Sequence, residues 1–227
     1  MLNYFWEKFS CIAGFVLVTL LTLSITAQAA EKSVETKHPV RIAVISFQPL
    51  IPEEESGSTV ICPICGIGYS SGKILKGSEK MVEEVFIDKL HELKEVAIIP
   101  PDKVQGVYKR IASESLKKPL LKVLKIVGNE LGADILAVGY IYRYTERVGY
   151  DYSSEHPASV AFEIHLIKTI DGSTIWRGVF DKTQKSLMED VFQASSFFKG
   201  GGKWLTARQL SKQGMDEIFE TFPGFER

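Results

Sequence analysis

The sequence predicts an α/β protein of α+β character, in which helices pack on one mixed β-sheet. Three observations support this class. In the first half, apolar β-rich runs alternate with amphipathic helical stretches, a β-α-β order that favours parallel strands joined by right-handed crossovers. Extended runs with short connections follow, which is typical of an antiparallel meander. The chain then ends in a helical tail, so helices are available to cover the sheet.

The first half is expected to fold as a strand, a helix, a strand and two further helices. RIAVISF, residues 41–47, is nearly all apolar and predicts a buried strand. Residues 79–93 carry apolar side chains at i, i+3 and i+4 spacings, which predicts an amphipathic helix. VAIIPP, residues 96–101, predicts a short strand that ends at proline. Helices are expected over residues 104–113 and 120–131, before the stop signal of a glycine.

The meander is expected over residues 135–148, 159–170 and 174–181, with an Asp-Gly-Ser turn between the last two strands. Alternation along the first of these strands places three tyrosines on one face. We interpret this stripe as half-buried sheet surface and as a candidate contact with another subunit: Tyr140, Tyr142 and Tyr144. Glu163 and His165 alternate onto one face of the following hairpin, which we expect to be solvated.

A helical extension is expected over residues 187–227, with a break at the glycine run of residues 200–202. Thr206 and Gln209 have the T-x-x-Q spacing of a capping box at the start of the last helix. Large aromatic side chains flank the glycine run. They are candidate partner contacts, unless they cover the sheet of their own domain: Phe197, Phe198 and Trp204.

The amino-terminal segment, residues 1–29, has the pattern of a secretory signal peptide. A basic start precedes an apolar run, and small residues in an A-x-A pattern predict cleavage after Ala29. The alternative is a retained anchor, but the run over residues 11–26 is shorter than the roughly 20 residues that span a bilayer. We therefore expect a periplasmic or otherwise exported protein, with a linker over residues 30–40 and a sheet domain over residues 41–186.

Charge and motifs exclude several function classes. The formal net charge of −1 argues against a nucleic-acid partner, which favours a basic face. The serines near His156 lack a nucleophile-elbow pattern, and the G-x-G elements do not open a helix after a strand. The sequence therefore predicts a protein that is not an enzyme and has no cofactor, unless zinc is shared between two chains.

RIAVISF, GADILAVGYIYR and LIKTIDGSTIWRGVFD resemble a widespread bacterial envelope-protein signature. The group includes the amino-terminal domain of the Tol-system translocation protein, the curli-export lipoprotein, and outer-membrane lipoproteins that activate penicillin-binding proteins. ASVAFEIHLI, FDKTQKSL and FFKGGGKWLTARQL are similar to a narrower set of uncharacterised envelope proteins and lipoproteins. The resemblance covers about residues 41–182, and its motifs concern the fold more than the function.

This resemblance implies a non-enzymatic interaction or assembly module of a periplasmic or outer-membrane-associated complex. Its partners would be envelope proteins, including further copies of the chain in a homo-oligomer, and association with the outer membrane would be peripheral. Two features depart from the group. The predicted cleavage site has no lipid-attachment cysteine, and a long cysteine-bearing insertion interrupts the domain.

The insertion spans residues 48–77, far above the usual loop length of about 4–6 residues, and its glycines predict a loop without regular structure. It contains Cys62 and Cys65 in a C-P-x-C-G arrangement. Because an exported protein meets an oxidising compartment, our first interpretation is a disulfide that fixes the loop. A thioredoxin-like dithiol would need a helix amino terminus after the first cysteine, and that context is missing.

A zinc site is the second interpretation of this cysteine pair. Structural zinc takes four ligands, and the pair supplies two of them. None of the histidines forms a second closely spaced pair, so the sequence favours an ion shared between two chains. The candidate histidine ligands are His38, His91, His156 and His165.

Overall fold

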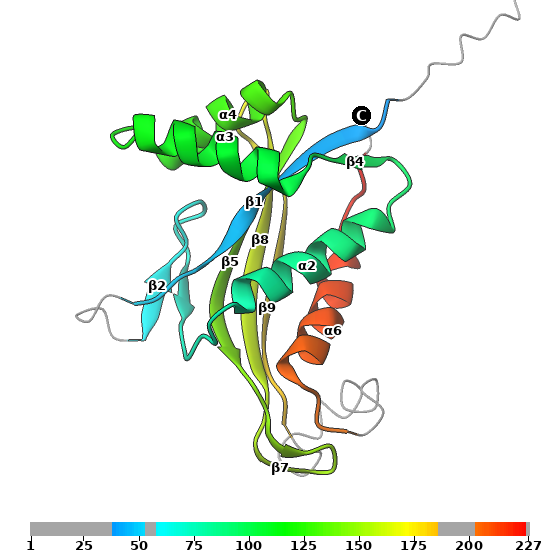
Figure 1. The fold of residues 1–227 in the computed structure, drawn as a ribbon. Helices are drawn as coiled ribbons and strands as arrows, with labels where there is room; N and C mark the ends of the chain where they lie inside the picture. The colour runs from blue at the N-terminus through cyan, green and yellow to red at the C-terminus, as the bar shows by residue number, and fades with distance from the viewer. Residues whose placement is uncertain (1–37, 53–57, 186–202, 226–227) are drawn as a thin grey trace, which may run out of the picture. The chain divides into compact units, whose positions relative to one another are not determined.

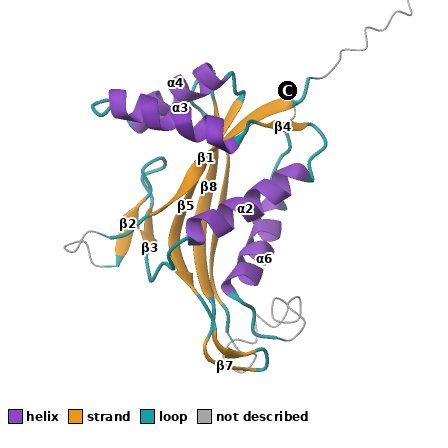
Figure 2. Ribbon diagram, in the orientation of Figure 1, coloured by secondary structure: helices purple, strands orange, loops and turns teal. Residues whose placement is uncertain are grey.

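A five-stranded mixed sheet forms the centre of the described chain, in the strand order β4-β1-β5-β8-β9 (Figures 1 and 2). The computed structural model describes residues 38–52, 58–185 and 203–225. The chain divides into two units, and all of these residues except His38 belong to the second unit, Pro39–Arg227. β1 pairs in parallel with β4 and β5, whereas β5, β8 and β9 are antiparallel, so the predicted mixed sheet is confirmed. The strands are β1 (Val40–Pro49), β4 (Val96–Ile98), β5 (Ile135–Thr145), β8 (Ser159–Lys168) and β9 (Thr174–Thr183).

Two helices cover one face of this sheet: α2 (Ser78–His91) and α6 (Ala207–Phe219). Figure 1 shows α2 crossing in front of the strands and α6 next to it, to the right of the strands. The apolar stripe predicted for α2 is buried, including Val82 and Phe86, and packs against β1 and β5. α6 begins at the predicted capping box of Thr206 and Gln209, which is confirmed.

The opposite face of the sheet is covered by α3 (Pro101–Glu114) and α4 (Leu120–Leu131) together with a β-hairpin. α4 ends as predicted at Gly132, whose φ of +60° favours glycine. The hairpin consists of β2 (Thr59–Ile61) and β3 (Gly68–Ser70) and contributes buried side chains to the same apolar cluster as the two helices.

The hairpin corrects the prediction that residues 48–77 lack regular structure. Two short runs pair in antiparallel register, and the Cys62 N–H donates to the carbonyl of Ile67 at 2.9 Å. Gly66, with a φ of +71°, lets the chain turn back between them. The segment after β3 is fixed to β5, because the N–H of Gly72 donates to the carbonyl of Tyr142 at 3.0 Å.

The expected tyrosine stripe on β5 is also corrected. Tyr140 and Tyr142 lie on the face with α3 and α4, whereas Tyr144 packs in the core under α2 and α6. A register shift of the β5–β8 pairing between Ile141 and Arg143 accompanies the change of face. All three tyrosines are at most 2% exposed, so within this chain they are core residues and not a half-buried surface.

A second short hairpin, β6 (Val148–Tyr150) with β7 (Ser153–His156), extends from the ends of β5 and β8. The segment before α6 is fixed to it, since the N–H of Trp204 donates to the carbonyl of Asp151 at 2.7 Å. Among the described residues, no helix has the length and apolar character needed to cross a membrane.

Candidate metal centre

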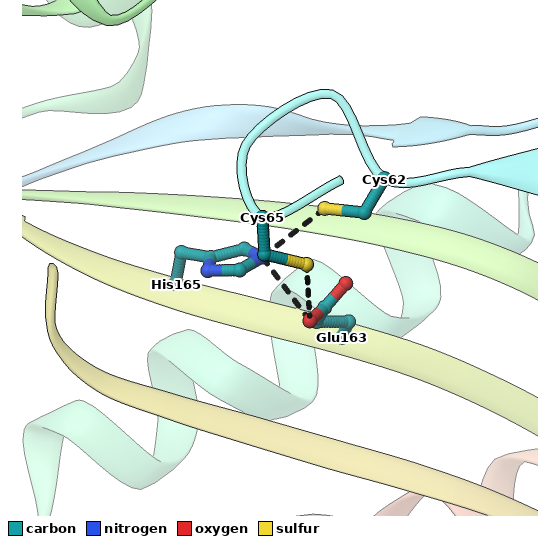
Figure 3. Close-up of side chains that lie close together, drawn as sticks. All are labelled: Cys62, Cys65, Glu163 and His165. Carbon is teal, nitrogen blue, oxygen red and sulfur yellow. Dashed lines mark hydrogen bonds and ion pairs between the residues drawn. The ribbon is translucent and has the colours of Figure 1, made fainter. Parts of the chain in front are cut away.

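Four potential metal ligands converge where the β2–β3 hairpin meets β8. The donor atoms of Cys62, Cys65, Glu163 and His165 all lie within 4.8 Å of one another. Figure 3 shows the turn of the hairpin holding the two sulfurs above the strand that carries the carboxylate and the imidazole. The two pairs are about 100 residues apart in sequence and meet only through the fold.

The alternation of β8 places the two strand ligands. Glu163 and His165 are two residues apart, so both point to the hairpin side, whereas Phe162 and Ile164 point to the core under α2. This division of faces was predicted. The prediction that the polar face is solvated is wrong, because Glu163 and His165 are both 0% exposed beneath the hairpin.

The distances fit a tetrahedral metal site. The Nε2 atom of His165 lies 3.3 Å from the Cys62 sulfur and 3.3 Å from the Oε1 atom of Glu163. The Cys65 sulfur lies 3.5 Å from the same Oε1. A tetrahedral zinc, with bonds of about 2.3 Å to sulfur and about 2.0–2.2 Å to nitrogen and oxygen, separates neighbouring donors by about 3.3–3.8 Å. Three of the six donor–donor distances therefore match a tetrahedral site, and the other three are at most 4.8 Å.

Several donors hold the Glu163 carboxylate in place. Its Oε1 atom accepts the hydroxyl of Tyr69 at 3.0 Å and the Nε–H of Arg177, and its Oε2 atom accepts the hydroxyl of Tyr142. Burial alone would raise the pKa of Glu163, but hydrogen bonds from His165 and Tyr142 outweigh it and lower the pKa below its usual value. The carboxylate is therefore charged, as a metal ligand must be.

Tyr69 and Tyr142 belong to the hairpin and to β5, so this network also attaches the hairpin to the sheet. Their rings stack with centroids 4.3 Å apart. The guanidinium of Arg177, on β9, donates to the Tyr69 hydroxyl and lies 5.9 Å from the centre of the Tyr69 ring. Burial raises the pKa of Tyr142, and its bond to Glu163 adds to this, so Tyr142 stays a neutral donor.

The two cysteines differ in access to solvent. Cys62 is 1% exposed, and burial raises the pKa of its thiol to about 12, whereas Cys65 is exposed. Both are free thiols, and their disulfide stays a prediction. His165 turns Nε2 toward the cluster. Within the described ranges, its Nδ1 atom has no hydrogen-bond partner, although metal-binding histidines usually have one there.

This donor set favours zinc among the common ions. Thiolate and imidazole are typical zinc ligands, and a carboxylate completes such sites. Four protein donors give a closed coordination shell, which is typical of structural zinc. The raised pKa of Cys62 opposes the alternative of a thioredoxin-like dithiol, whose attacking cysteine has a lowered pKa.

The structure brings together only some of the residues singled out in the sequence. Cys62, Cys65 and His165 meet, and Tyr142 supports them, but His91 and His156 are exposed and outside the cluster, as is His38. Trp204 is partly buried beside the β6–β7 hairpin, and Phe197 and Phe198 lie outside the described residues. Glu163 was not among the candidate ligands predicted from the sequence. The signal was its E-x-H spacing with His165 on one strand.

No family model and no curated protein matches the chain. Solved structures with a similar fold include the PelC dodecamer from Paraburkholderia phytofirmans, with 10% identity, a TM-score of 0.43, and 81% of this chain and 86% of that chain covered. Lipoprotein GNA1162 from Neisseria meningitidis has 12% identity and a TM-score of 0.41, and the match covers 72% of this chain and 99% of that chain. The LpoB C-terminal domain from Escherichia coli has 10% identity and a TM-score of 0.39, and the match covers 71% of this chain and 93% of that chain.

Proposed function

We propose that this chain is a zinc-binding protein in which Cys62, Cys65, Glu163 and His165 hold one ion within a single chain. The observation that carries the proposal is the convergence of these four donors within 4.8 Å of one another. Two thiols, an imidazole and a charged carboxylate form a donor set suited to zinc. Sharing between two chains is not needed to complete the ligand count, because Glu163 supplies the missing donor.

The proposed role of the ion is to fasten the β2–β3 hairpin to the sheet. Two ligands come from the hairpin turn and two from β8, so the metal would link segments that the chain joins only through about 100 intervening residues. With four protein ligands, the ion has no open position for a substrate. This supports a structural role in a binding protein over catalysis.

The test is the metal content of the reduced full chain, measured by elemental mass spectrometry and by native mass. We expect one zinc per monomer. The double change Cys62→Ser with Cys65→Ser should abolish binding, and His165→Gln should weaken it at least about 10-fold, as loss of a ligand weakens metal sites more than loss of its supporting partners. His156→Gln is the matched control, because His156 is exposed outside the cluster.

Two results would count against the intrachain site. Reduced protein that binds no zinc would remove the proposal altogether. Zinc found only in dimers, with half an ion per chain, would support the shared-ion alternative instead.

As a second candidate function, we propose that the hairpin serves a non-enzymatic interaction module of the cell envelope, with another copy of the chain as its partner. The supporting observation is a pair of large apolar side chains on the hairpin, Ile61 and Ile67, which are 67% and 45% exposed. Large exposed apolar patches mark interaction surfaces, and these two side chains would contribute to such a patch. The predicted signal peptide supports an exported location for such a complex, and the resemblance to envelope proteins supports a periplasmic or outer-membrane-associated one.

Sedimentation velocity of the zinc-loaded full chain tests this candidate. Ile61→Asp combined with Ile67→Asp should weaken self-association, because burying an unpaired carboxylate in an interface is unfavourable. Leu116→Asp is the control, since Leu116 is 87% exposed and lies between α3 and α4. Unchanged self-association in the double variant would remove the hairpin from the interface.

A further inference from the structure

The two sulfurs of the metal centre are also placed to bond to each other. Cys62 and Cys65 are free thiols whose sulfurs lie within 4.8 Å. They occupy positions i and i+3 of a turn, closed by the N–H of Gly66 donating to the carbonyl of Cys62 at 2.9 Å. This is a five-residue turn with the geometry of one turn of helix, in which residues three apart lie on the same side with Cβ atoms about 5–6 Å apart. A disulfide needs Cβ atoms about 3.5–4.5 Å apart, so a small adjustment of the turn together with side-chain rotation brings the sulfurs into bonding range.

We propose that zinc binding and a Cys62–Cys65 disulfide exclude each other, so that oxidation by a disulfide-containing oxidant releases the metal. This inference rests on the proposed zinc site and adds its regulation. Disulfide and zinc, which the sequence left as alternatives, become two states of one site. The protein is predicted to be exported to an oxidising compartment, where disulfides form and persist, so both the zinc-bound and the disulfide state can be reached there.

The chemistry balances as a two-electron thiol–disulfide exchange. One protein thiolate attacks the oxidant's disulfide, forms a mixed disulfide and expels the first oxidant sulfur as a thiolate. The second protein thiolate then attacks the mixed disulfide, closes the Cys62–Cys65 bond and expels the second oxidant sulfur. The two cysteines are oxidised and the oxidant is reduced to two thiols, which take their protons from solvent, while the zinc ion leaves with its charge unchanged.

The unequal exposure of the two sulfurs sets the order of attack. Cys65 is the more exposed of the two, so its sulfur is the more accessible to an oxidant, whereas Cys62 is 1% exposed and is shielded from a bulky disulfide. Cys65 is therefore the entry point, and Cys62 resolves the mixed disulfide from within the site. Once the two sulfurs are joined, Glu163 and His165 are the two remaining ligands of the four. Two ligands are too few for a closed zinc site.

The site is built to survive the loss of the ion. Glu163 keeps hydrogen bonds from Tyr69, Tyr142 and Arg177, so its buried charge stays compensated without a metal. The segment after β3 also keeps its hydrogen bond from the N–H of Gly72 to the carbonyl of Tyr142. Release is therefore expected to leave the sheet folded and the cycle reversible.

The experiment uses the full chain with Cys11→Ser, so that the two site thiols are the only ones present. Reduced protein is loaded with zinc, freed of excess metal and treated with oxidised glutathione. A chromogenic chelator follows zinc, while alkylation and intact mass follow the thiols. We expect one zinc released for each pair of thiols lost, a mass lower by two hydrogens, and zinc affinity at least about 1,000-fold weaker, because half of the donors are gone. Reductant should restore binding.

Two controls isolate the role of the thiols. His165→Gln keeps both cysteines but lacks a metal ligand, so it should form the disulfide with little zinc to release. His156→Gln should release zinc as the parent protein does, because His156 is outside the cluster.

The results that overturn the inference differ from those that overturn the zinc site. Reduced protein that never binds zinc removes both. Reduced protein that binds zinc, but keeps it after the disulfide has formed, removes only the inference.

Discussion

Glu83 and Glu163 have pKa values shifted in opposite directions, and the donors around each carboxylate explain the difference. Glu83, on α2, accepts the backbone N–H of Phe47 at 2.8 Å, but this bond does not replace its lost hydration, so burial raises its pKa. Glu163 is more deeply buried, yet hydrogen bonds from His165 and Tyr142 outweigh that burial and lower its pKa. A buried carboxylate is thus stabilised as an anion only where several donors converge.

The change Glu83→Gln tests this reasoning. Since the folded pKa of Glu83 is raised, its carboxyl costs stability above its ordinary pKa, and the cost disappears as pH falls below that value. Gln keeps an acceptor for Phe47 but carries no charge. We expect a higher melting temperature than the parent at pH 7, with the difference vanishing toward pH 4, measured by thermal unfolding across this range.

Asp88→Asn is the control for that series, because Asp88 is exposed on the same helix. A Glu83→Gln variant that is less stable than the parent at pH 7 would show that the charged bond to Phe47 outweighs the burial.

The alternation of β8 was enough to place Glu163 and His165 on one face, but not to predict their burial. A local pattern shows which residues share a face, whereas the cover over that face comes from elsewhere in the chain. Here the cover is the turn with Cys62 and Cys65, whose sulfurs reach their partners across 103 and 98 residues. The ligand count therefore became complete only when the fold brought these segments together.

At the scale of elements, long periodic segments were predicted well and short ones were not. α2 and α4 carry sustained apolar stripes, and both were found. β2 and β3 are three residues each, in a glycine-rich segment with no sustained alternation. Such strands are stabilised by tertiary contacts, such as the stacking of Tyr69 on Tyr142, which the local sequence does not reveal.

The capping box of α6 gives a prediction at this scale. The Thr206 side chain accepts the N–H of Gln209 at 3.2 Å, and the Gln209 side chain accepts the N–H of Thr206 at 2.9 Å. Thr206→Ala should lower the free energy of unfolding by about 1 kcal/mol, because an N–H group of the first turn loses its partner. Chemical denaturation measures this loss.

Thr206→Ser is the matched variant and should stay within about 0.5 kcal/mol of the parent, since serine caps as well as threonine. Equal losses in both variants would mean that the threonine methyl group, and not the cap, supplies the stability.

At the scale of the whole molecule, the order of elements in the sequence predicted the mixed sheet, because βαβ connections and hairpins permit few topologies. The sheet has an apolar cluster on each side, one under α2 and α6 and one under α3, α4 and the β2–β3 hairpin. Only the second cluster adjoins the metal centre. The zinc ion is therefore expected to add stability to a fold that its apolar cores already hold together.

Thermal unfolding of the full chain with and without zinc measures that contribution. At a free zinc concentration about 100 times the dissociation constant, linkage adds about 2.7 kcal/mol, which corresponds to roughly 5–11 °C for a domain of this size. Chelation should return the melting temperature to the metal-free value without removing the cooperative transition. The variant with Cys62→Ser and Cys65→Ser should show no zinc-dependent shift. If chelation instead abolished the transition, the ion would be required for folding, and the two apolar clusters alone would not sustain the sheet.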